Sequence, residues 1–178
     1  MSGTIELKTK RLILRRHIPA DADVLFEMLG TDPKMFEYSG WNPYKTREMA
    51  KKTIDSFIDS YSDPHFYGWG IEKDGRLIGT VGAYDFDPAG SRIEAGMSVE
   101  RQSWGCGYAT EALSAVLEYL TKHEQIRTVS AWCASDNAAS LKVMQKSGMK
   151  LKSTEPGALE INGIRYDKLI LEYSMDPN

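Results

Sequence analysis

The sequence predicts an α+β fold: a twisted, mixed sheet of about seven strands flanked by about four helices. Two observations predict this class. Three strand-like segments with short connections, residues 66–73, 76–84 and 93–99, follow one another and are expected to pair antiparallel. A helical pattern over residues 107–122 then leads to a buried strand at 127–133, and a helix that connects two neighbouring strands makes them parallel.

Length and composition limit what the chain can be. Its 178 residues, 42% of them hydrophobic, suit a single domain over 1–178. The net charge of -3 lacks the basic excess of a general nucleic-acid binder, so we expect no nucleic-acid partner. No apolar run approaches the ~20 residues that span a bilayer, and the first residues lack a signal-peptide pattern. We therefore expect a cytoplasmic protein with no membrane partner.

Cysteine and histidine usage argues against metal or thiol chemistry. The two cysteines, Cys106 and Cys133, are too few for a disulfide framework and lack the spacing of metal ligands. The histidines at positions 17, 65 and 123 are scattered and are interpreted as surface or structural residues. We expect no metal and no catalytic cysteine.

The first part of the chain predicts a strand and two helices. Leu12 and Leu14 alternate with Arg11, Ile13 and Arg15 in a half-buried first strand. Gly30 is the expected end of the first helix, and Thr46 is the expected N-cap of the second. Between these helices, residues 31–45 carry aromatic side chains without a period, interrupted by Pro and Gly. This pattern indicates a loop that serves either packing or ligand contact.

Gly105 and Gly107 lie between the third strand of the antiparallel set and the following helix. Because they lack a Cβ atom, they allow a tight bend and let a ligand approach the backbone N–H groups. The helix start adds unpaired N–H groups and a partial positive charge, which together favour a phosphate group. A dinucleotide fold would place such glycines after the first strand of repeated βαβ units, with an acid about 20 residues on, and this chain has neither feature.

The last third of the chain predicts a capped helix and a closing hairpin. Ser135 or Asp136 is the expected N-cap of the helix, and Gly148 is its expected end. Asn162 with Gly163 predicts a tight turn, and residues 166–175 alternate as a closing strand. An exposed final strand could pair with a second copy, so a homodimer is a candidate assembly.

Two motifs together resemble those of the Gcn5-related N-acetyltransferase (GNAT) superfamily. The run Gln102-x-x-Gly105-x-Gly107-x-Ala109 resembles its pyrophosphate loop, and the residues from Trp104 to Ala112 resemble the RimJ/RimL branch, which acetylates the N-termini of ribosomal proteins. The helix that carries Asn137-x-x-Ser140 resembles the family segment that binds the pantetheine arm of coenzyme A. The resemblance covers about residues 8–176 and implies a GNAT fold with acetyl-CoA as co-substrate.

This resemblance implies which residues hold the cofactor and the acceptor. The loop amides would hold the diphosphate, and the strand before the loop would hold the pantetheine and the thioester carbonyl. In this family the segment between the first two helices lines the acceptor side, so Trp41 and Tyr44 are implied substrate contacts. The implied cofactor-binding residues are Met97, Ser98, Val99, Gln102, Gly105, Cys106, Gly107, Tyr108, Ala109, Thr110, Asn137 and Ser140.

Acetyl transfer to an amine requires that the protein orient both groups and that the amine be neutral. Deprotonating an α-amino group at pH 7 costs about 1 kcal/mol, against roughly 4.6 kcal/mol for a lysine, so an N-terminal amine is the easier substrate. Glu94 matches the Glu-x-Gly pattern of the family and is the implied base or amine-binding residue; its alternative role is an ordinary strand position. Glu160, near the closing hairpin, is a rival carboxylate on the acceptor side.

Many relatives protonate the departing thiolate with a tyrosine seven residues after the helix asparagine. That position is Met144 here, so Ser140, directly or through water, is the implied acid. The sequence therefore predicts an acetyl-CoA-dependent N-acetyltransferase that acts on a protein N-terminal α-amine or on a small-molecule amine. Two alternatives stay open: a CoA-binding sensor or interaction module without turnover, and a nucleotide-dependent oxidoreductase.

Overall fold

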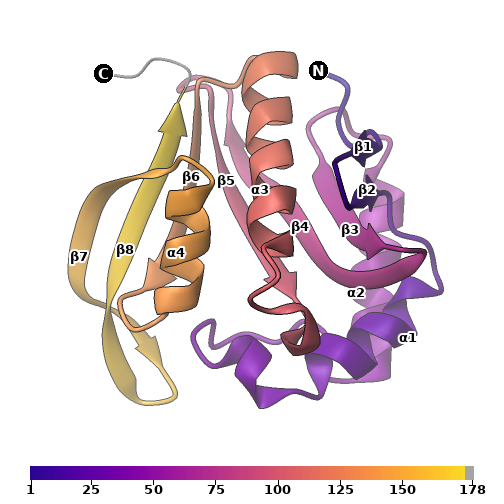
Figure 1. Ribbon diagram of the computed structural model, residues 1–178, viewed down its shortest axis with the longest axis horizontal. Helices are drawn as coiled ribbons and strands as arrows, with labels where there is room; N and C mark the ends of the chain where they lie inside the picture. Colours follow the sequence, from indigo (N-terminus) through magenta and orange to yellow (C-terminus); the bar gives the residue numbers. More distant parts are fainter. Residues whose placement is uncertain (175–178) are drawn as a thin grey trace.

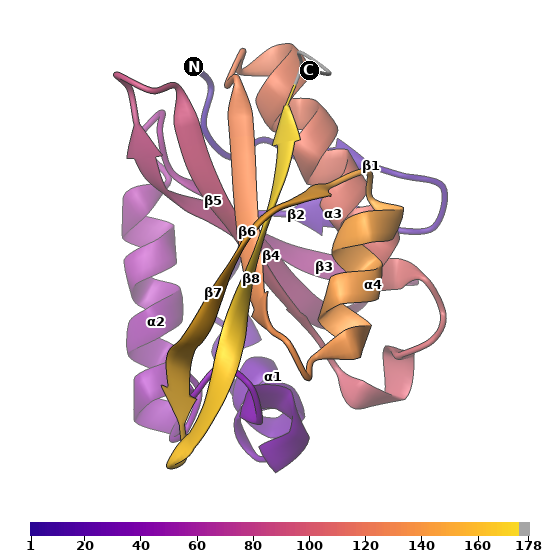
Figure 2. The same cartoon turned by 90° about the vertical axis from the view of Figure 1, so that its left-hand side faces the viewer.

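The computed structural model describes residues 1–174, which contain one sheet of eight strands in the order β1-β2-β3-β4-β5-β6-β8-β7. Helices α1 and α2 lie on one side of the sheet, and α3 and α4 lie on the other (Figures 1 and 2). The mixed sheet and its flanking helices confirm the expected fold class. The strand count exceeds the approximate expectation by one, because a two-residue strand, β1, pairs with β2.

The elements follow one another along the chain with short connections. The strands are β1 (Leu7–Lys8), β2 (Ile13–Arg15), β3 (Tyr67–Lys73), β4 (Arg76–Asp87), β5 (Arg92–Val99), β6 (Thr128–Ala134), β7 (Lys150–Ile161) and β8 (Ile164–Ser174). The helices are α1 (Asp21–Leu25), α2 (Arg47–Ser60), α3 (Tyr108–Glu118) and α4 (Ala138–Lys146). Single helical turns cover Phe26–Gly30, Pro33–Phe36, Arg101–Ser103 and Tyr119–His123.

Several local signals in the sequence act as expected. The Thr46 hydroxyl accepts a hydrogen bond from the Met49 N–H and caps α2. Gly30 ends the first helical segment, and a Cβ atom there would lie 1.9 Å from the carbonyl oxygen of Tyr44. Gly30 is therefore required because the 31–45 loop packs directly against it. The hairpins between β3 and β4 and between β7 and β8 turn through two residues with positive φ each, as expected.

Two hydrophobic clusters bury opposite faces of the sheet. The larger cluster joins the sheet to α3 and α4 and contains Leu14, Trp69, Leu113 and other fully buried side chains. The smaller cluster joins α1 and α2 to the opposite face. Side chains alternate between the two faces along each strand, so residues on the α2 face of β4 and β5 point away from the larger cluster.

The parallel strands β5 and β6 pair over three residues and then diverge. Their paired positions run from Arg92 with Thr128 to Glu94 with Ser130. Beyond this point β5 pairs with β4 alone, and β6 pairs with β8 alone. The two central strands therefore separate toward their carboxyl ends, next to the turn that leads into α3 (Figure 1).

Two expectations for the last third of the chain are wrong. The N-cap of α4 is Asn137, whose side chain accepts a hydrogen bond from the Ser140 N–H, and not Ser135 or Asp136. The closing strand β8 is not exposed: it lies between β6 and β7, so β7 forms the edge of the sheet. Pro156 and two lysines on β7 disfavour pairing along that edge. The last residue of the expected strand, Met175, lies outside the described residues.

Candidate active site

The turn between β5 and α3 presents backbone rather than side chains to a ligand. Gly105 and Gly107 have φ values of 76° and 80°, a region that favours glycine. A Cβ atom at Gly105 would meet no atom within 4 Å, so the backbone there faces open space. Gly107 is the N-cap of α3 and provides no side chain to cap it. The first N–H groups of α3 are thus available to an anion.

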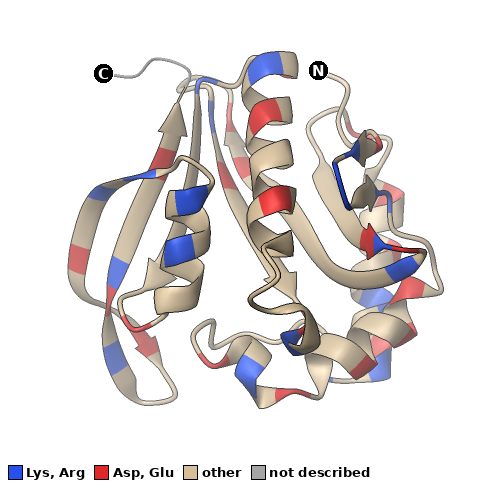
Figure 3. Ribbon diagram, in the orientation of Figure 1, with Lys and Arg blue, Asp and Glu red and all other residues tan. Residues whose placement is uncertain are grey.

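Positive charge reaches this turn from neighbouring elements. Residues 102–110 carry no charged side chain (Figure 3). The Arg11 guanidinium donates to the Cys106 carbonyl at 2.9 Å and lies 4.6 Å from the centre of the Tyr108 ring. The Lys73 ammonium lies 5.6 Å from the same ring. No local pattern in the sequence indicates these cations; Arg11, for example, occupies an ordinary polar position of the expected first strand.

Glu111, in the first turn of α3, fixes Arg11 in this place. Its carboxylate accepts from Arg11 Nε at 2.7 Å and from the Thr9 hydroxyl at 2.6 Å. Burial acts to raise the pKa of Glu111, but these hydrogen bonds outweigh it and lower the pKa. The carboxylate therefore stays ionised and holds the guanidinium against the turn.

The start of the turn is anchored on the sheet. The buried carboxylate of Glu100 pairs with Arg76 and accepts from the Ser103 hydroxyl at 2.8 Å. The Trp104 indole N–H donates to the Val99 carbonyl at 2.7 Å. These contacts hold the backbone between strand and helix, while Gln102 and Cys106 remain exposed.

The other cofactor residues expected from the sequence lie around this turn. Met97 and Ser98 are half-buried on β5, where that strand has separated from β6, and Val99 is buried. The half-buried residues at the start of α3 are Tyr108, Ala109 and Thr110.

The start of α4 offers a polar group to the same region. The side-chain oxygen of Asn137 accepts from the Ser140 N–H at 3.1 Å, which uses the oxygen and leaves the amide NH₂ without a partner in residues 1–174. Ser140 is half-buried. Met144 is only 1% exposed and packs in the larger cluster, so its position contributes no proton donor.

Glu94 lies where β5 and β6 separate. Its carboxylate accepts from the Trp132 indole N–H at 3.0 Å. Tyr84, its neighbour on β4, has a pKa raised first by burial and then by the charge of Glu94. The Lys168 ammonium lies 5.1 Å from the Trp132 ring. Sequence reasoning identified Glu94 but missed Tyr84 and Trp132, because strand pairing alone brings them to it.

The structure keeps Glu160 apart from Glu94. Glu160 lies opposite Arg165 of β8, near the hairpin turn. Glu94 lies opposite Ser130 of β6, which in turn lies opposite Glu172 of β8. Arg165 and Glu172 are seven residues apart on β8, roughly 24 Å along an extended strand. Glu160 is exposed, with Arg165 Nε at 3.7 Å from its carboxylate.

The two expected aromatic contacts of the acceptor side lie together. Trp41 is 67% exposed and Tyr44 is 5% exposed, and both line one surface hollow beside α2. The loop that carries them also touches the β7–β8 hairpin, since the rings of Tyr38 and Tyr166 meet edge to face at 5.7 Å. The loop thus spans from α2 to the hairpin.

The described residues contain neither a cluster of metal ligands nor a helix that could span a membrane. Within residues 1–174, no group of three or more His, Cys, Asp or Glu side chains is placed to hold a metal ion. No helix in that range is long and apolar enough to cross a membrane.

Comparison with known proteins agrees with this geometry. The chain is 29% identical over 163 residues to the Uncharacterized N-acetyltransferase YoaA of Bacillus subtilis (strain 168), which covers 90% of this chain and 92% of YoaA. The fold of this chain matches that of RimL, a ribosomal-protein alpha-N-acetyltransferase in complex with coenzyme A, with a TM-score of 0.88 and 18% identity. The match covers 98% of this chain and 100% of the RimL chain. The fold also matches the microcin self-immunity acetyltransferase MccE in complex with acetyl-CoA and AMP, with a TM-score of 0.84, 18% identity and coverage of 94% of each chain.

The family model described as the acetyltransferase (GNAT) domain matches residues 11–150, well over half of the chain. This match includes the glycine turn, Glu94 and the start of α4. It confirms the family that the motifs indicate. The chain belongs to the GNAT acetyltransferase family.

Proposed function

We propose that this protein transfers the acetyl group of acetyl-CoA directly to a primary amine, either a protein N-terminal α-amine or a small-molecule amine. The observation that carries the proposal is the divergence of β5 and β6 between the glycine turn and Glu94. It leaves a space for the pantetheine arm that has an anion site at one end and a carboxylate at the other. RimL is named as a protein alpha-N-acetyltransferase, and MccE is an acetyltransferase solved with acetyl-CoA and the small molecule AMP, so the fold alone does not decide between the two acceptor classes.

The cofactor side divides among three segments. The backbone N–H groups of residues 105–110 bind the diphosphate, and Gln102 flanks them. Residues 97–99, which have no partner strand toward β6, pair with the pantetheine and donate to the thioester carbonyl. Asn137 uses its free amide NH₂ and Ser140 its hydroxyl to hold the pantetheine arm.

On the acceptor side, Glu94 receives or orients the amine. The Trp132 indole N–H and the Tyr84 hydroxyl are both hydrogen-bond partners of its carboxylate, whose two oxygens have further lone pairs for a substrate N–H or an ordered water. Glu160 is too far along β8 to act on the same amine. The attacking nitrogen forms the new amide bond, the carbon–sulfur bond breaks, and the amine proton leaves through the Glu94 carboxylate.

The departing thiolate takes a proton from Ser140 or from water that Ser140 holds. Met144 supplies no acid, because its thioether is buried in the core. A thiol with a pKa of about 8.5 is a good leaving group near neutral pH, so a weak donor suffices. The absence of a proton donor at Met144 also favours a second candidate function, a CoA-binding module without turnover.

Thermal unfolding with and without acetyl-CoA tests the cofactor site. At a hundredfold excess over Kd, binding adds about 2.7 kcal/mol, which raises the midpoint of a domain of this size by roughly 5 to 10 °C. NAD and ATP at equal concentration serve as controls, and a shift with NAD instead would reject the proposal in favour of an oxidoreductase. Thiol release from acetyl-CoA with short peptides and small amines then separates an acetyltransferase from a binding module.

A further inference from the structure

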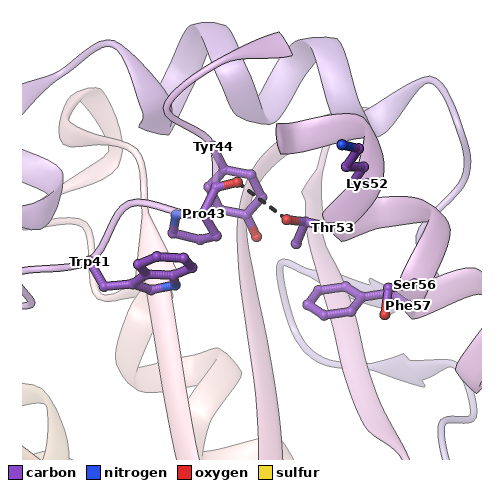
Figure 4. A pocket seen from close by; sticks show the side chains of 7 residues that line it. All are labelled: Trp41, Pro43, Tyr44, Lys52, Thr53, Ser56 and Phe57. Atoms are coloured by element: carbon purple, nitrogen blue, oxygen red, sulfur yellow. Dashed lines mark hydrogen bonds between the residues drawn. The ribbon is translucent and has the colours of Figure 1, made fainter. Parts of the chain in front are cut away.

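A hollow of about 480 Å³ lies between α2 and the loop ahead of it. Its lining includes Trp41, Pro43, Tyr44 and, from α2, Phe57. Figure 4 shows the Tyr44 ring between the Trp41 indole and the Phe57 ring, with the hydroxyl directed toward the space between them. The volume falls within the range of small-molecule sites, about 300 to 1,000 Å³.

Hydrogen bonds hold the outer wall of this hollow in place. The Thr53 hydroxyl of α2 shares its one proton between the Met49 carbonyl of the same helix, at 2.9 Å, and the Pro43 carbonyl, at 3.2 Å and drawn in Figure 4. The Asn42 amide donates to the Gly30 carbonyl at 2.9 Å. The loop is therefore tied at both sides, and the hollow exists before any ligand arrives.

A buried chain of polar groups supports the floor. Tyr44 is 5% exposed, burial raises its pKa to about 12, and the Thr80 hydroxyl on β4 is its hydrogen-bond partner. Thr80 Oγ1 lies 3.2 Å from His17 Nε2, and His17 Nδ1 lies 2.9 Å from the Asp21 carboxylate. Arg15 binds both oxygens of that carboxylate, at 2.8 and 3.0 Å.

Thr80 joins this chain to the sheet, because its hydroxyl also donates to the Trp69 carbonyl at 3.2 Å. The Asp21 carboxylate accepts the hydrogen bond from His17 Nδ1. The Thr80 oxygen lies among His17 Nε2, the Trp69 carbonyl and the Tyr44 hydroxyl, and this network holds the Tyr44 hydroxyl in place at the base of the hollow. His17 is thus a positioning residue for Tyr44.

The hollow lies close to the thioester end of the proposed cofactor site. Thr80 is directly opposite Ser98 on β5, which is one strand spacing away, about 4.8 Å. Glu94 points to the same face of β5, four residues before Ser98. Between them Gly82 and Gly96 face each other across the two strands, and the Tyr84 ring packs over Gly96, with its hydroxyl 3.2 Å from where a Cβ atom there would lie.

The lining restricts what the hollow can hold. Three aromatic rings and a proline face it, and a flat apolar group gains most from such surfaces. Among the described residues the lining contains no carboxylate, and its cation Lys52 pairs with Glu48 at 2.9 Å, so a second positive charge on a ligand has no partner in the hollow.

We propose that this hollow is the acceptor subsite for a flat apolar group carried close to the reacting amine, with Tyr44 as its polar floor. The inference rests on the proposed function, since it places that group beside the thioester. It defines the substrate class as an aromatic or similarly flat amine without a second cationic group.

The test compares two amines on protein saturated with CoA, which carries no acetyl group and therefore permits binding without turnover. Tryptamine is the probe, and n-butylamine is the same amine without a ring. Isothermal titration is expected to show that the wild-type protein binds tryptamine about tenfold more tightly. Trp41→Ala abolishes that preference and leaves n-butylamine unchanged.

Leu151→Ala is the matched control, because Leu151 is a 55% exposed apolar side chain on the edge strand β7. It is expected to leave both dissociation constants as in the wild type. Equal affinity of the wild-type protein for the two amines, or a preference that survives Trp41→Ala, would overturn the subsite. The thermal shift with acetyl-CoA is measured without amine and tests the proposed function separately. If acetyl-CoA raises the melting temperature but the protein shows no preference for tryptamine, only the subsite is rejected.

The positioning role of His17 is tested through Thr80. Thr80→Val removes the hydroxyl between His17 and Tyr44 and weakens tryptamine binding about threefold or more, whereas Thr80→Ser retains it and binds normally. Tyr44→Phe gives the same loss, and combining it with Thr80→Val adds nothing further. A change in CoA affinity to the same extent, or identical behaviour of the serine and valine variants, would contradict this role. If the valine variant fails to fold, Tyr44→Phe alone carries the comparison.

Discussion

Glu94 lies opposite Ser130 in the last residue pair that joins β5 to β6. The point where the parallel strands part is therefore also the point where a carboxylate faces the acceptor side. The Trp132 indole N–H orients that carboxylate from the next strand at 3.0 Å. A single break in strand pairing thus creates both the space for a thioester and its position relative to a candidate base.

Glu94→Gln should abolish most of the turnover while acetyl-CoA still binds. The amide keeps the hydrogen bond with Trp132 but cannot accept the amine proton, and general-base catalysis commonly contributes about 100-fold or more. Thiol-release kinetics give kcat, and the acetyl-CoA thermal shift reports binding. Glu160→Gln, an exposed carboxylate near the hairpin, is the control with normal turnover. The reverse pattern would transfer the role to Glu160.

Gly107→Ala should weaken acetyl-CoA binding by at least about tenfold. The residue has a φ of 80°, and a Cβ atom would lie 3.4 Å from the Arg11 guanidinium. Alanine strains the turn by about 1 kcal/mol and moves the backbone N–H groups that face the diphosphate. The dissociation constant can be measured by titration calorimetry.

Gly75→Ala provides a matched control for that experiment. Gly75 has a φ of 77° in the β3–β4 hairpin, and a Cβ atom there meets nothing within 4 Å. Alanine at this position causes a similar backbone strain but lies outside the turn before α3. Equal losses of acetyl-CoA affinity in the two variants would show that general destabilisation, rather than the turn, is responsible.

Asn137 performs two separable tasks, and two substitutions distinguish them. Asn137→Asp keeps an oxygen that accepts from the Ser140 N–H, so the stability of α4 is retained, but it removes the NH₂ donor for pantetheine. Asn137→Ala loses both and also costs about 1 kcal/mol of folding free energy. We expect weak CoA binding in both variants and a lower melting temperature in the alanine variant alone. Normal CoA affinity in the aspartate variant would limit Asn137 to helix capping.

Asp21 should make the protein less stable in acid. Burial acts to raise its pKa, but hydrogen bonds from His17 and Arg15 outweigh this and place the pKa well below its usual range. A carboxyl with a depressed folded pKa contributes stability above its unfolded pKa of about 3.9 and loses it as the pH falls further. Urea unfolding between pH 7 and pH 3 measures this loss.

The variant Asp21→Asn should remove that acid dependence and cost about 2 kcal/mol at pH 7, because Arg15 and His17 lose a charged hydrogen-bond partner while Glu72 still pairs with Arg15. Asp23→Asn on the same helix is the control: that side chain is 72% exposed and should change stability little. A small, equal effect in both variants would show that the buried ion pair contributes no net stability.

Much of the candidate site follows from local sequence signals. Thr46, Gly30 and the two hairpin turns behave as their backbone preferences require, since caps and positive φ depend on a few neighbouring atoms. Gly105 and Gly107 likewise reveal a turn that a ligand can approach. Glu94 is recognisable because it precedes that turn by a fixed distance along one strand.

Other features depend on contacts between distant segments. Arg11 reaches the turn before α3 only because Glu111, one hundred residues later, holds its side chain. Pattern reasoning assigned the cap of α4 to Ser135 or Asp136, but the backbone leaves β6 in such a way that Asn137 caps it. The order of β8 and β7, which places the closing strand inside the sheet, is equally invisible in an alternating pattern.

Short-range chemistry thus determined most of the elements, several of their ends and the family motifs, because propensity, capping and turn geometry are properties of adjacent residues. Strand pairing and packing settled the rest. They placed Trp132 and Tyr84 beside Glu94, put Glu160 out of its reach, and built the hollow between Trp41 and Phe57. These relationships join residues tens of positions apart, and only the free energy of the whole packed sheet selects them.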